Sequence, residues 1–350
     1  MEQPAVTETQ AAPPDGSWTA PGAFRVGPGV HRIPLPLGSN GLRAVNVYAV
    51  EDGDALVLID SGWALALART RLEEGLAAIG RGLGDVTRFL MTHMHTDHYS
   101  QAVVLRREFG IRFGVGLGER PSLELWADGR EGELAPQLRR LNGCGAAPVA
   151  KLVRSVVADR APTDLTWELP DEWLVPGDIP LEARTLEAVA TPGHTRGHLC
   201  FRDAAHGLLF AGDHVLPTIT PSLGFEPALP GLPLADFLAS LRLIRSQPDA
   251  VLLPAHGPVR PSVHARVDDL LAHHAVRLGE AEQAVCGGAA TAYEVARLLT
   301  WTSRKRRLSD MDPFNQMLAV LETCAHLDLL VVQGRCRAQV SDGVTGYLAR

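Results

Sequence analysis

THMHTDH, residues 92–98, follows a short apolar run at 86–91 and carries four potential metal ligands within six positions. The apolar run is typical of a buried strand, so the ligands fall on the turn where that strand ends. Imidazole and carboxylate groups suit Zn²⁺, Fe or Mn ions. On such a turn, His93 and His95 can face one ion while Asp97 and His98 face another. A site for a single ion and a hydrogen-bonded polar loop are the two alternatives.

Three more potential ligands stand at the ends of three later predicted strands. TPGH at 191–194 ends with His194, AGD at 211–213 ends with Asp213, and PAHG at 254–257 contains His256. Layered α/β folds usually place chemistry at strand ends, because loops there can vary while the sheet stays rigid. A carboxylate can bridge two cations, so Asp213 is the natural shared ligand. A hydroxide held between the same ions would be the nucleophile.

The pattern along the chain predicts a layered α/β fold. Strand-like runs at 24–36 and 44–62 come first, and the second contains a hairpin turn at 51–54. Helical spacing follows at 63–80 and again from near Ser100, and each helix leads into a short strand. Strands return at 180–193, 198–213 and 249–258, with a helix at about 234–245.

Three segments outside this pattern complete the predicted domain organisation. Residues 1–23 are Pro-rich without an apolar run, so we expect a disordered lead before a catalytic domain at 24–261. Residues 119–175 predict short helices broken by prolines, which we interpret as a lid inserted in that domain. Residues 262–350 predict helices at 263–285, 292–299 and 313–327 followed by two short strands at 329–333 and 336–343, a winged-helix-like arrangement.

Composition favours a soluble cytoplasmic protein. The chain has 350 residues, of which 46% are hydrophobic and 21% charged, as in globular proteins. Its five cysteines form no Cys-x-x-Cys pair, which suits reduced thiols in a cytosol. No run approaches the ~18 apolar residues of a membrane span, so we expect no membrane partner. The formal net charge of −7 does not favour nucleic acid as a partner.

The order HxHxDH, Thr-Pro-Gly-His, Gly-Asp and Ala-His-Gly resembles the metallo-β-lactamase superfamily, with LIDSG at 58–62 as the strand and turn before the site. The resemblance covers about residues 24–261 and implies an αββα sandwich with a glyoxalase II-like ligand set. It assigns one metal ion to His93, His95 and His194, the other to Asp97, His98 and His256, and Asp213 to both. Asp60 would support the ligands from behind. The segment after residue 261 resembles a subgroup with a C-terminal winged-helix-like domain.

This resemblance implies a metal-dependent hydrolase with two divalent ions, expected to be Zn²⁺ with Fe or Mn as alternatives. We expect a small-molecule ester or thioester substrate, as in acyl-thioesterases, glyoxalase II-like enzymes or lactonases, with Asp97 as the catalytic residue that orients the hydroxide. Dinuclear secreted β-lactamases carry Cys where Asp213 stands, and flavodiiron proteins carry Glu where His95 stands, so neither activity is expected. The alternative is a metal-dependent endoribonuclease or phosphodiesterase that uses the basic run at 304–307, and a non-enzymatic binding protein is the third possibility. A homodimer is left open.

The remaining histidines and aromatic residues divide into two groups. His198 and His214 stand next to ligands in the sequence, and we expect them to hydrogen-bond the loops, with proton donation to a leaving group as the alternative. Packing is predicted for Tyr99 and Trp63, and surface or packing positions for His264, His273, His274 and His326.

Overall fold

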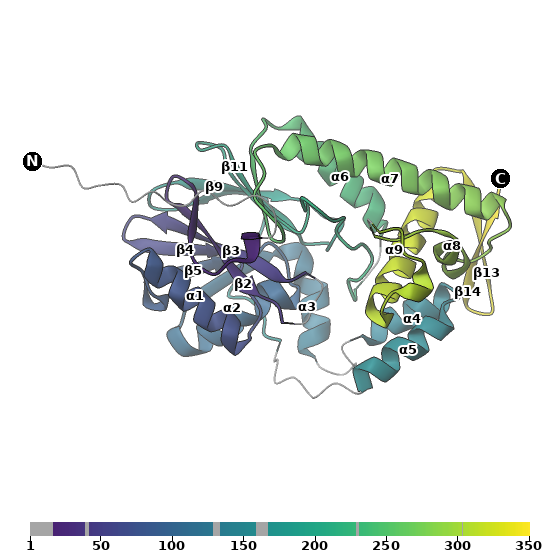
Figure 1. Cartoon of the computed structure of the whole chain (residues 1–350), viewed down its shortest axis with the longest axis horizontal. Helices are drawn as coiled ribbons and strands as arrows, with labels where there is room; N and C mark the ends of the chain where they lie inside the picture. The colour runs from purple at the N-terminus through teal and green to yellow at the C-terminus, as the bar shows by residue number, and fades with distance from the viewer. Residues whose placement is uncertain (1–16, 39–41, 129–133, 159–166, 229–230, 303) are drawn as a thin grey trace, which may run out of the picture.

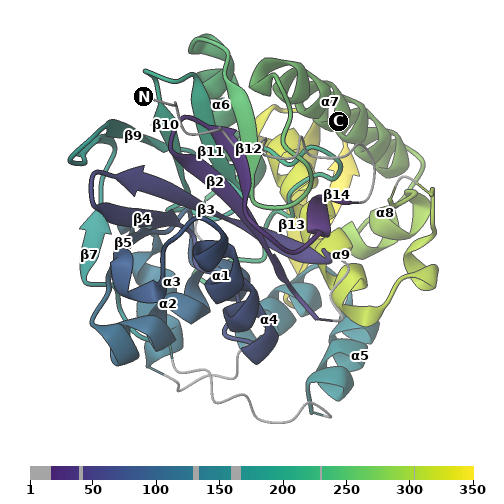
Figure 2. The same cartoon turned by 60° about the vertical axis from the view of Figure 1, so that its left-hand side comes forward.

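A computed structural model describes residues 17–38, 42–128, 134–158, 167–228, 231–302 and 304–350. Two β-sheets lie face to face, and helices cover the outer face of each (Figures 1 and 2). Most of the predicted disordered lead, residues 1–16, lies outside the described residues. The prediction is wrong for its end, because Ser17–Thr19 form a 3₁₀ turn whose Trp18 carbonyl accepts a hydrogen bond from Arg32.

The first sheet has seven strands in sequence order. β1 to β4 are antiparallel neighbours, and β4 to β7 are parallel ones. The β3–β4 hairpin turns at Gly53-Asp54, inside the predicted turn, and Gly53 has a φ of 61° that favours glycine. The strands are β1 (Phe24–Gly27), β2 (Val30–Pro36), β3 (Ala44–Asp52), β4 (Ala55–Ile59), β5 (Val86–Leu90), β6 (Arg112–Gly116) and β7 (Glu172–Leu174).

The second sheet has five strands in the order β12-β11-β10-β9-β8. All neighbours are antiparallel except β11 and β12, which are parallel. The strands are β8 (Gly177–Pro180), β9 (Thr185–Ala190), β10 (Leu199–Asp203), β11 (Leu208–Gly212) and β12 (Val251–Pro254). β12 follows β11 in parallel because α6 (Pro233–Ser246) makes the crossover between them.

Three apolar clusters show how the layers pack. Side chains of both sheets, including Tyr48 and Phe210, form the middle cluster. The outer face of the first sheet packs on α1 (Ala66–Ala78), α2 (Thr96–Phe109) and α3 (Arg120–Ala127). The outer face of the second sheet packs on α6 and the helices that follow it. The predicted αββα sandwich is therefore confirmed.

The second helix begins earlier than the sequence pattern predicted. We expected it near Ser100, but α2 starts at Thr96, which puts Asp97 and His98 in its first turn rather than on a loop. The sequence pattern did not reveal this start, because Thr96–His98 are polar and add no residue to an apolar face of the helix. A carboxylate such as that of Asp97 is favourable there, since the N-terminal end of a helix carries partial positive charge.

The predicted insert at 119–175 forms three short helices within its described part, but the prediction of helix is wrong at its end, because β7 belongs to the first sheet and pairs with β6. α3 is followed by α4 (Ala135–Gly143) and α5 (Ala147–Ala158). Pro121, Pro136 and Pro148 stand in the first turn of their helices, where the missing N–H costs nothing, so these prolines start helices rather than break them. Pro162 lies outside the described residues. The lid function remains a prediction.

The C-terminal helices begin where the sequence predicted them and pack against the insert. The C-terminal elements are α7 (Val263–Cys286), α8 (Ala292–Leu298), α9 (Pro313–Val332), β13 (Cys336–Ser341) and β14 (Val344–Ala349). The strand expected at 329–333 is wrong, because that apolar run continues α9 up to Val332. α9 contacts α4 to α8, and one continuous apolar cluster includes Leu141 of α4, Leu270 of α7 and Val320 of α9. The division at residue 261, the winged-helix assignment and the cytoplasmic location remain predictions.

α9 is long and apolar enough to cross a membrane by length and composition alone. Most of its apolar window, 61%, is buried inside the fold. Its packing against the surrounding helices therefore accounts for its composition.

Replacement of Gly116 by alanine is expected to destabilise the fold. A Cβ there would stand 2.0 Å from the carbonyl oxygen of Gly197, a backbone atom that cannot move aside. We expect the free energy of unfolding to fall by about 1–3 kcal/mol. Gly84→Ala is the matched control, because its Cβ would meet nothing within 4 Å. Urea unfolding of the two variants measures this, and equal midpoints would contradict the close approach of the two loops.

Candidate metal centre

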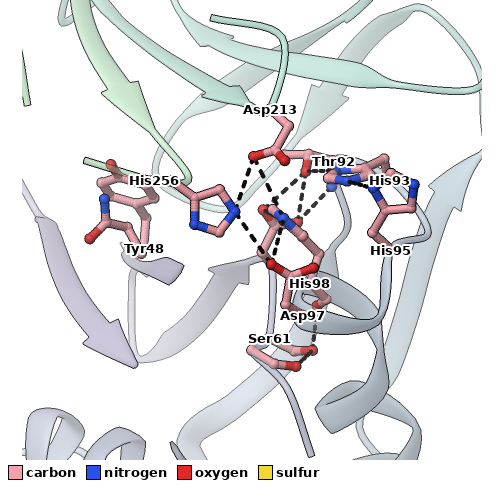
Figure 3. A network of polar contacts seen from close by, with 12 residues as sticks. Tyr48, Ser61, Thr92, His93, His95, Asp97, His98, Asp213 and His256 are labelled. Carbon is pink, nitrogen blue, oxygen red and sulfur yellow. Dashed lines mark hydrogen bonds and ion pairs between the residues drawn. The ribbon is translucent and has the colours of Figure 1, made fainter. Parts of the chain in front are cut away.

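The seven predicted ligands meet at one edge of the two sheets. Figure 3 labels all of them except His194. His93 and His95 lie between β5 and α2, and Asp97 and His98 lie in the first turn of α2. The other three follow strands of the second sheet: His194 follows β9, Asp213 follows β11 and His256 follows β12. The sandwich thus brings together side chains that are up to 163 positions apart in the sequence, from His93 to His256.

Three imidazoles converge in the first cluster. The Nδ1 atom of His95 lies 3.0 Å from Nε2 of His93 and 2.9 Å from Nε2 of His194. These three ring nitrogens have more lone pairs than N–H protons, so they cannot all be satisfied by hydrogen bonds to one another. This arrangement is typical of ligands that surround a cation.

The second cluster combines Asp97, His98 and His256, and Asp213 lies between the two clusters. Oδ2 of Asp97 is 3.3 Å from Nε2 of His256 and 3.8 Å from Nε2 of His98. Oδ1 of Asp213 is 3.3 Å from Nε2 of His256 and 3.7 Å from Nε2 of His98. The other oxygen of Asp213, Oδ2, is 3.5 Å from Nε2 of His194. One carboxylate therefore faces both clusters.

Acceptors behind three imidazoles determine which nitrogen faces the centre. Nδ1 of His98 lies 2.8 Å from Oδ2 of Asp60, Nδ1 of His194 lies 2.7 Å from the Ser222 carbonyl, and Nδ1 of His256 lies 2.8 Å from the Ala44 carbonyl. A carbonyl or carboxylate oxygen only accepts, so each Nδ1 donates its proton. In the neutral rings, Nε2 then turns a lone pair towards the centre.

The donor set fits two divalent ions. Among the described residues, the buried atoms His98 Nε2 and Asp213 Oδ1 have no hydrogen-bond partner, which is costly unless a cation or a water occupies the space between them. Three groups have ligand atoms within 4.8 Å of one another: His93, His95 and His194; His93, His98 and Asp213; Asp97, His98 and His256. The donors are imidazoles and carboxylates without thiolates, as in sites for borderline metal ions.

The protonation of these groups in the absence of a cation follows from burial and charge. Burial, with help from the neighbouring imidazoles, holds the pKa of His93 and His95 well below the usual range. Burial acts the same way on His98, but the carboxylates of Asp60, Asp97 and Asp213 outweigh it and raise its pKa to about 10. The pKa of Asp97 is lowered because His98 and His256 outweigh the effect of burial. A divalent ion would therefore displace a proton from His98.

Two buried glutamates that the sequence analysis missed hold the loops of the first cluster. The carboxyl group of Glu119 accepts a hydrogen bond from Thr195 Oγ1 and others from the backbone of Met94 and Gly197. Glu226 accepts from Ser122 Oγ and from the backbone N–H of Arg196, each at 2.7 Å. Burial and the neighbouring Glu226 raise the pKa of Glu119 well above its usual range. Glu119 thus links the loop of His93 and His95 to the loop of His194.

Glycines at the contact between the Glu119 segment and the His194 loop are the one sequence feature connected with the position of Glu119. A Cβ on Gly197 would stand 2.2 Å from the backbone nitrogen of Glu119, so only glycine allows the two segments to meet. Gly116 and Gly118 make similarly close approaches to residue 197. Nothing in the sequence alone pairs glycines about eighty positions apart.

His198 and His214 are both fully buried. His198 Nε2 accepts a hydrogen bond of 3.2 Å from the backbone N–H of Asp213, and its ring stacks on His93 with centroids 5.2 Å apart. The geometry of His198 therefore supports the expected role of hydrogen-bonding the loops rather than proton donation. Tyr99 packs on Phe113 and donates to the Glu168 carbonyl at 2.6 Å, while Trp63 packs against the first-sheet cluster.

Asp60→Asn is expected to weaken metal binding without unfolding the chain. The Asp60 carboxylate accepts from the backbone N–H of Thr92 at 2.8 Å and holds His98 Nδ1, and its φ of 60° is one that asparagine tolerates. Loss of the charge removes the support of His98, so affinity for the second ion should fall about 10–100-fold. Competition with a chelator measures this. Asp52→Asn, which changes a buried acid that accepts from Ala183, is the control, and equal affinities in both variants would contradict the role of Asp60.

Glu119→Ala is expected to lower the affinity for one ion while the second remains bound. The substitution unlinks the loops of the first cluster but leaves Asp97, His98 and His256 in place. Metal content after dialysis at limiting metal is the measurement. Glu124→Ala is the control, because Glu124 pairs with Arg120 on the exposed face of α3. An unchanged metal content in the Glu119 variant would refute the link.

Comparisons with known proteins agree with this geometry. The sequence profile described as the Metallo-beta-lactamase superfamily matches residues 40–256. The probable metallo-hydrolase YqjP of Bacillus subtilis is 27% identical over 90% of this chain and 93% of its own. The crystal structure of a metallo-beta-lactamase family protein from Thermus thermophilus has a TM-score of 0.77 and 26% identity, covering 92% of this chain and 99% of that one. An atrochrysone carboxyl ACP thioesterase of Emericella nidulans is 26% identical over 69% of this chain and 60% of its own.

The profile match spans more than half of the chain and contains all seven ligand positions. The fold and the order of the strand-end histidines and aspartates agree with it. The chain therefore belongs to the metallo-beta-lactamase superfamily and is an enzyme of the metallo-hydrolase class.

Proposed function

We propose that this enzyme is a dinuclear metal-dependent hydrolase that cleaves a small-molecule ester or thioester. The observation that carries the proposal is the position of Asp213, whose two oxygens face different histidine clusters at 3.3–3.7 Å. A carboxylate in this position suits two cations that share one ligand.

The ligand assignment follows the two clusters. His93, His95 and His194 would hold one ion, Asp97, His98 and His256 the other, and Asp213 both. Zn²⁺ is the proposed ion, with Fe or Mn as alternatives, because five of the seven donors are imidazoles. Bound divalent ions would supply Lewis acidity, which activates a water and polarises a carbonyl oxygen.

Asp97 is the proposed catalytic residue. Its lowered pKa keeps the carboxylate ionised, so Oδ2 can accept a hydrogen bond from a water and orient it. Its side chain is 16% exposed, whereas the side chain of His98 is fully buried. Asp97 thus stands on the side of the centre that a substrate can reach.

An aromatic wall beside His95 favours an acyl substrate. The rings of His95 and Phe225 have centroids 5.5 Å apart, and Phe225 lies 5.7 Å from Phe314 at the start of α9. Gln137 and Arg140 of α4 donate to the carbonyls of Phe225 and Gly224 and so hold this loop. Apolar rings suit the carbon chain of an ester or thioester better than a phosphodiester backbone. The similarity to an acyl-carrier-protein thioesterase supports the same substrate class.

A substrate panel with matched variants tests the proposal. The parent protein should cleave an aryl ester, an acyl thioester or a lactone with little change in rate between low and moderate salt. His95→Ala and Asp213→Ala should lower kcat/KM by about 10³-fold, because each removes metal-based stabilisation of several kcal/mol. His264→Ala, which changes a histidine of α7 outside the centre, should keep full activity.

Two results would refute this proposal. Full activity of the folded His95 and Asp213 variants would contradict the dinuclear site. Turnover of RNA alone, with binding that weakens steeply as salt rises, would favour the ribonuclease alternative and the basic run at 304–307.

A further inference from the structure

Four polar side chains meet between α7 and α9, away from the strand ends. His273 and His274 lie on α7, and Glu322 and His326 lie on α9, which packs against α7 (Figure 1). The ligand atoms of His273, His274 and Glu322 lie within 4.8 Å of one another. The sequence predicts surface or packing positions for these histidines, and spacing along the chain does not show Glu322 beside them, because it comes from another helix.

A hydrogen-bonded relay determines which nitrogen of His274 is free. His326 Nδ1 lies 2.8 Å from the carbonyl of Glu322, so this nitrogen donates and Nε2 accepts. His274 Nδ1, 3.2 Å from His326 Nε2, then donates in turn. His274 Nε2 is left with a lone pair, and it is buried without a hydrogen-bond partner among the described residues.

This arrangement repeats the one at the strand-end centre. There, too, an acceptor behind the ring holds Nδ1–H and turns Nε2 outward as a potential ligand. His274 is 0% exposed, so an unpaired Nε2 is costly unless something binds it. The unpaired nitrogen therefore indicates that a further group binds there.

The chemistry of the three groups suits a divalent transition-metal ion. Burial, with His326 and His273 nearby, lowers the pKa of His274 to about 2, so the ring is neutral and needs to lose no proton before it binds. Burial raises the pKa of Glu322 to about 7, and a cation would favour its ionised form. Two imidazoles and one carboxylate are a familiar three-residue set for Zn²⁺, with water in the fourth position.

Arg277 lies near the cluster and has hydrogen-bond partners of its own. Its guanidinium donates to Glu280 at 2.8 Å and to the Thr300 carbonyl at 3.2 Å, and it lies 4.5 Å from the centroid of the Trp301 ring. Arg277 lowers the pKa of His273 and His274 and so also favours their neutral forms. The three ligand groups remain available to a cation.

A phenylalanine separates this cluster from the strand-end centre. The Phe237 ring of α6 lies between His214, next to Asp213, and His274, with centroid distances of 5.1 and 5.4 Å. A cation at His274 would therefore not share a ligand with the hydrolytic centre. Loss of the cluster should leave hydrolysis unchanged.

We infer that His273, His274 and Glu322 form a separate site for a divalent transition-metal ion such as Zn²⁺, which ties α7 to α9. Metal ions that bind only the folded chain stabilise it, so this site would strengthen the contact between two helices of the C-terminal region. The site goes beyond the proposed hydrolase function and does not depend on it.

The test compares bound Zn²⁺ per chain after equilibrium dialysis of the full-length protein and its variants. The parent should bind one more Zn²⁺ than His274→Ala and one more than Glu322→Gln, whatever the hydrolytic centre holds. Esterase activity per folded chain should be the same in all three proteins. Since His274 is buried and its variant could unfold, Glu322→Gln and His273→Ala at the solvent-accessible side provide the second measurement.

His264→Ala is the matched control, because it removes a histidine from the first turn of the same helix, where Nε2 bonds to the Gln247 carbonyl. It should bind as much Zn²⁺ as the parent. Equal Zn²⁺ content in the parent, Glu322→Gln and His273→Ala proteins would overturn the inference. An equal loss of Zn²⁺ in His264→Ala would overturn it as well, because the loss would then follow the removal of any histidine rather than of these ligands.

Discussion

The carboxylate of Asp60 is the constraint on which the rest of the centre depends. It follows β4 with a left-handed φ of 60°, and it binds the backbone N–H and hydroxyl of Thr92 at the end of the neighbouring β5. The same carboxylate holds Nδ1 of His98 in the first turn of α2. One buried charge thus joins two strands and a helix, and it orients the segment that carries four of the seven proposed ligands. A strained backbone at such a position is common where a site has to be held in one geometry.

The two sheets bring the remaining ligands next to the segment that Asp60 holds. Each sheet brings ligands to the shared edge, and the Tyr48 hydroxyl and the Asn46 amide of the first sheet bond to the Pro254 carbonyl just before His256. Five imidazoles and two carboxylates in so small a volume would be unfavourable as uncompensated charges, because burial penalises each charged form. Divalent cations would resolve this conflict, and they would account for the buried atoms of His98 and Asp213 that have no hydrogen-bond partner among the described residues. The stability of the edge and its chemistry therefore have the same origin.

The sequence predicted the sandwich and the side chains that meet at the strand ends, because both depend on local patterns. Strands ending in His or Asp, and the spacing of THMHTDH, are visible in short windows. The start of α2 was missed because the ligand residues lack an apolar stripe, and Glu119 was missed because its partners come from loops far along the chain. The relay from Glu322 to His274 was invisible for the same reason, since it needs the packing of α9 on α7. Contacts between distant segments, rather than propensities, separate what the sequence could predict from what it could not.

The central claim is that two cations share Asp213. Anomalous X-ray diffraction at the zinc edge from crystals grown with Zn²⁺ tests it most directly. The account predicts two anomalous peaks on either side of the Asp213 carboxylate, about 3.5–4 Å apart, as in other two-metal sites. One peak next to Asp97, His98 and His256 alone, or peaks that do not flank Asp213, would contradict it.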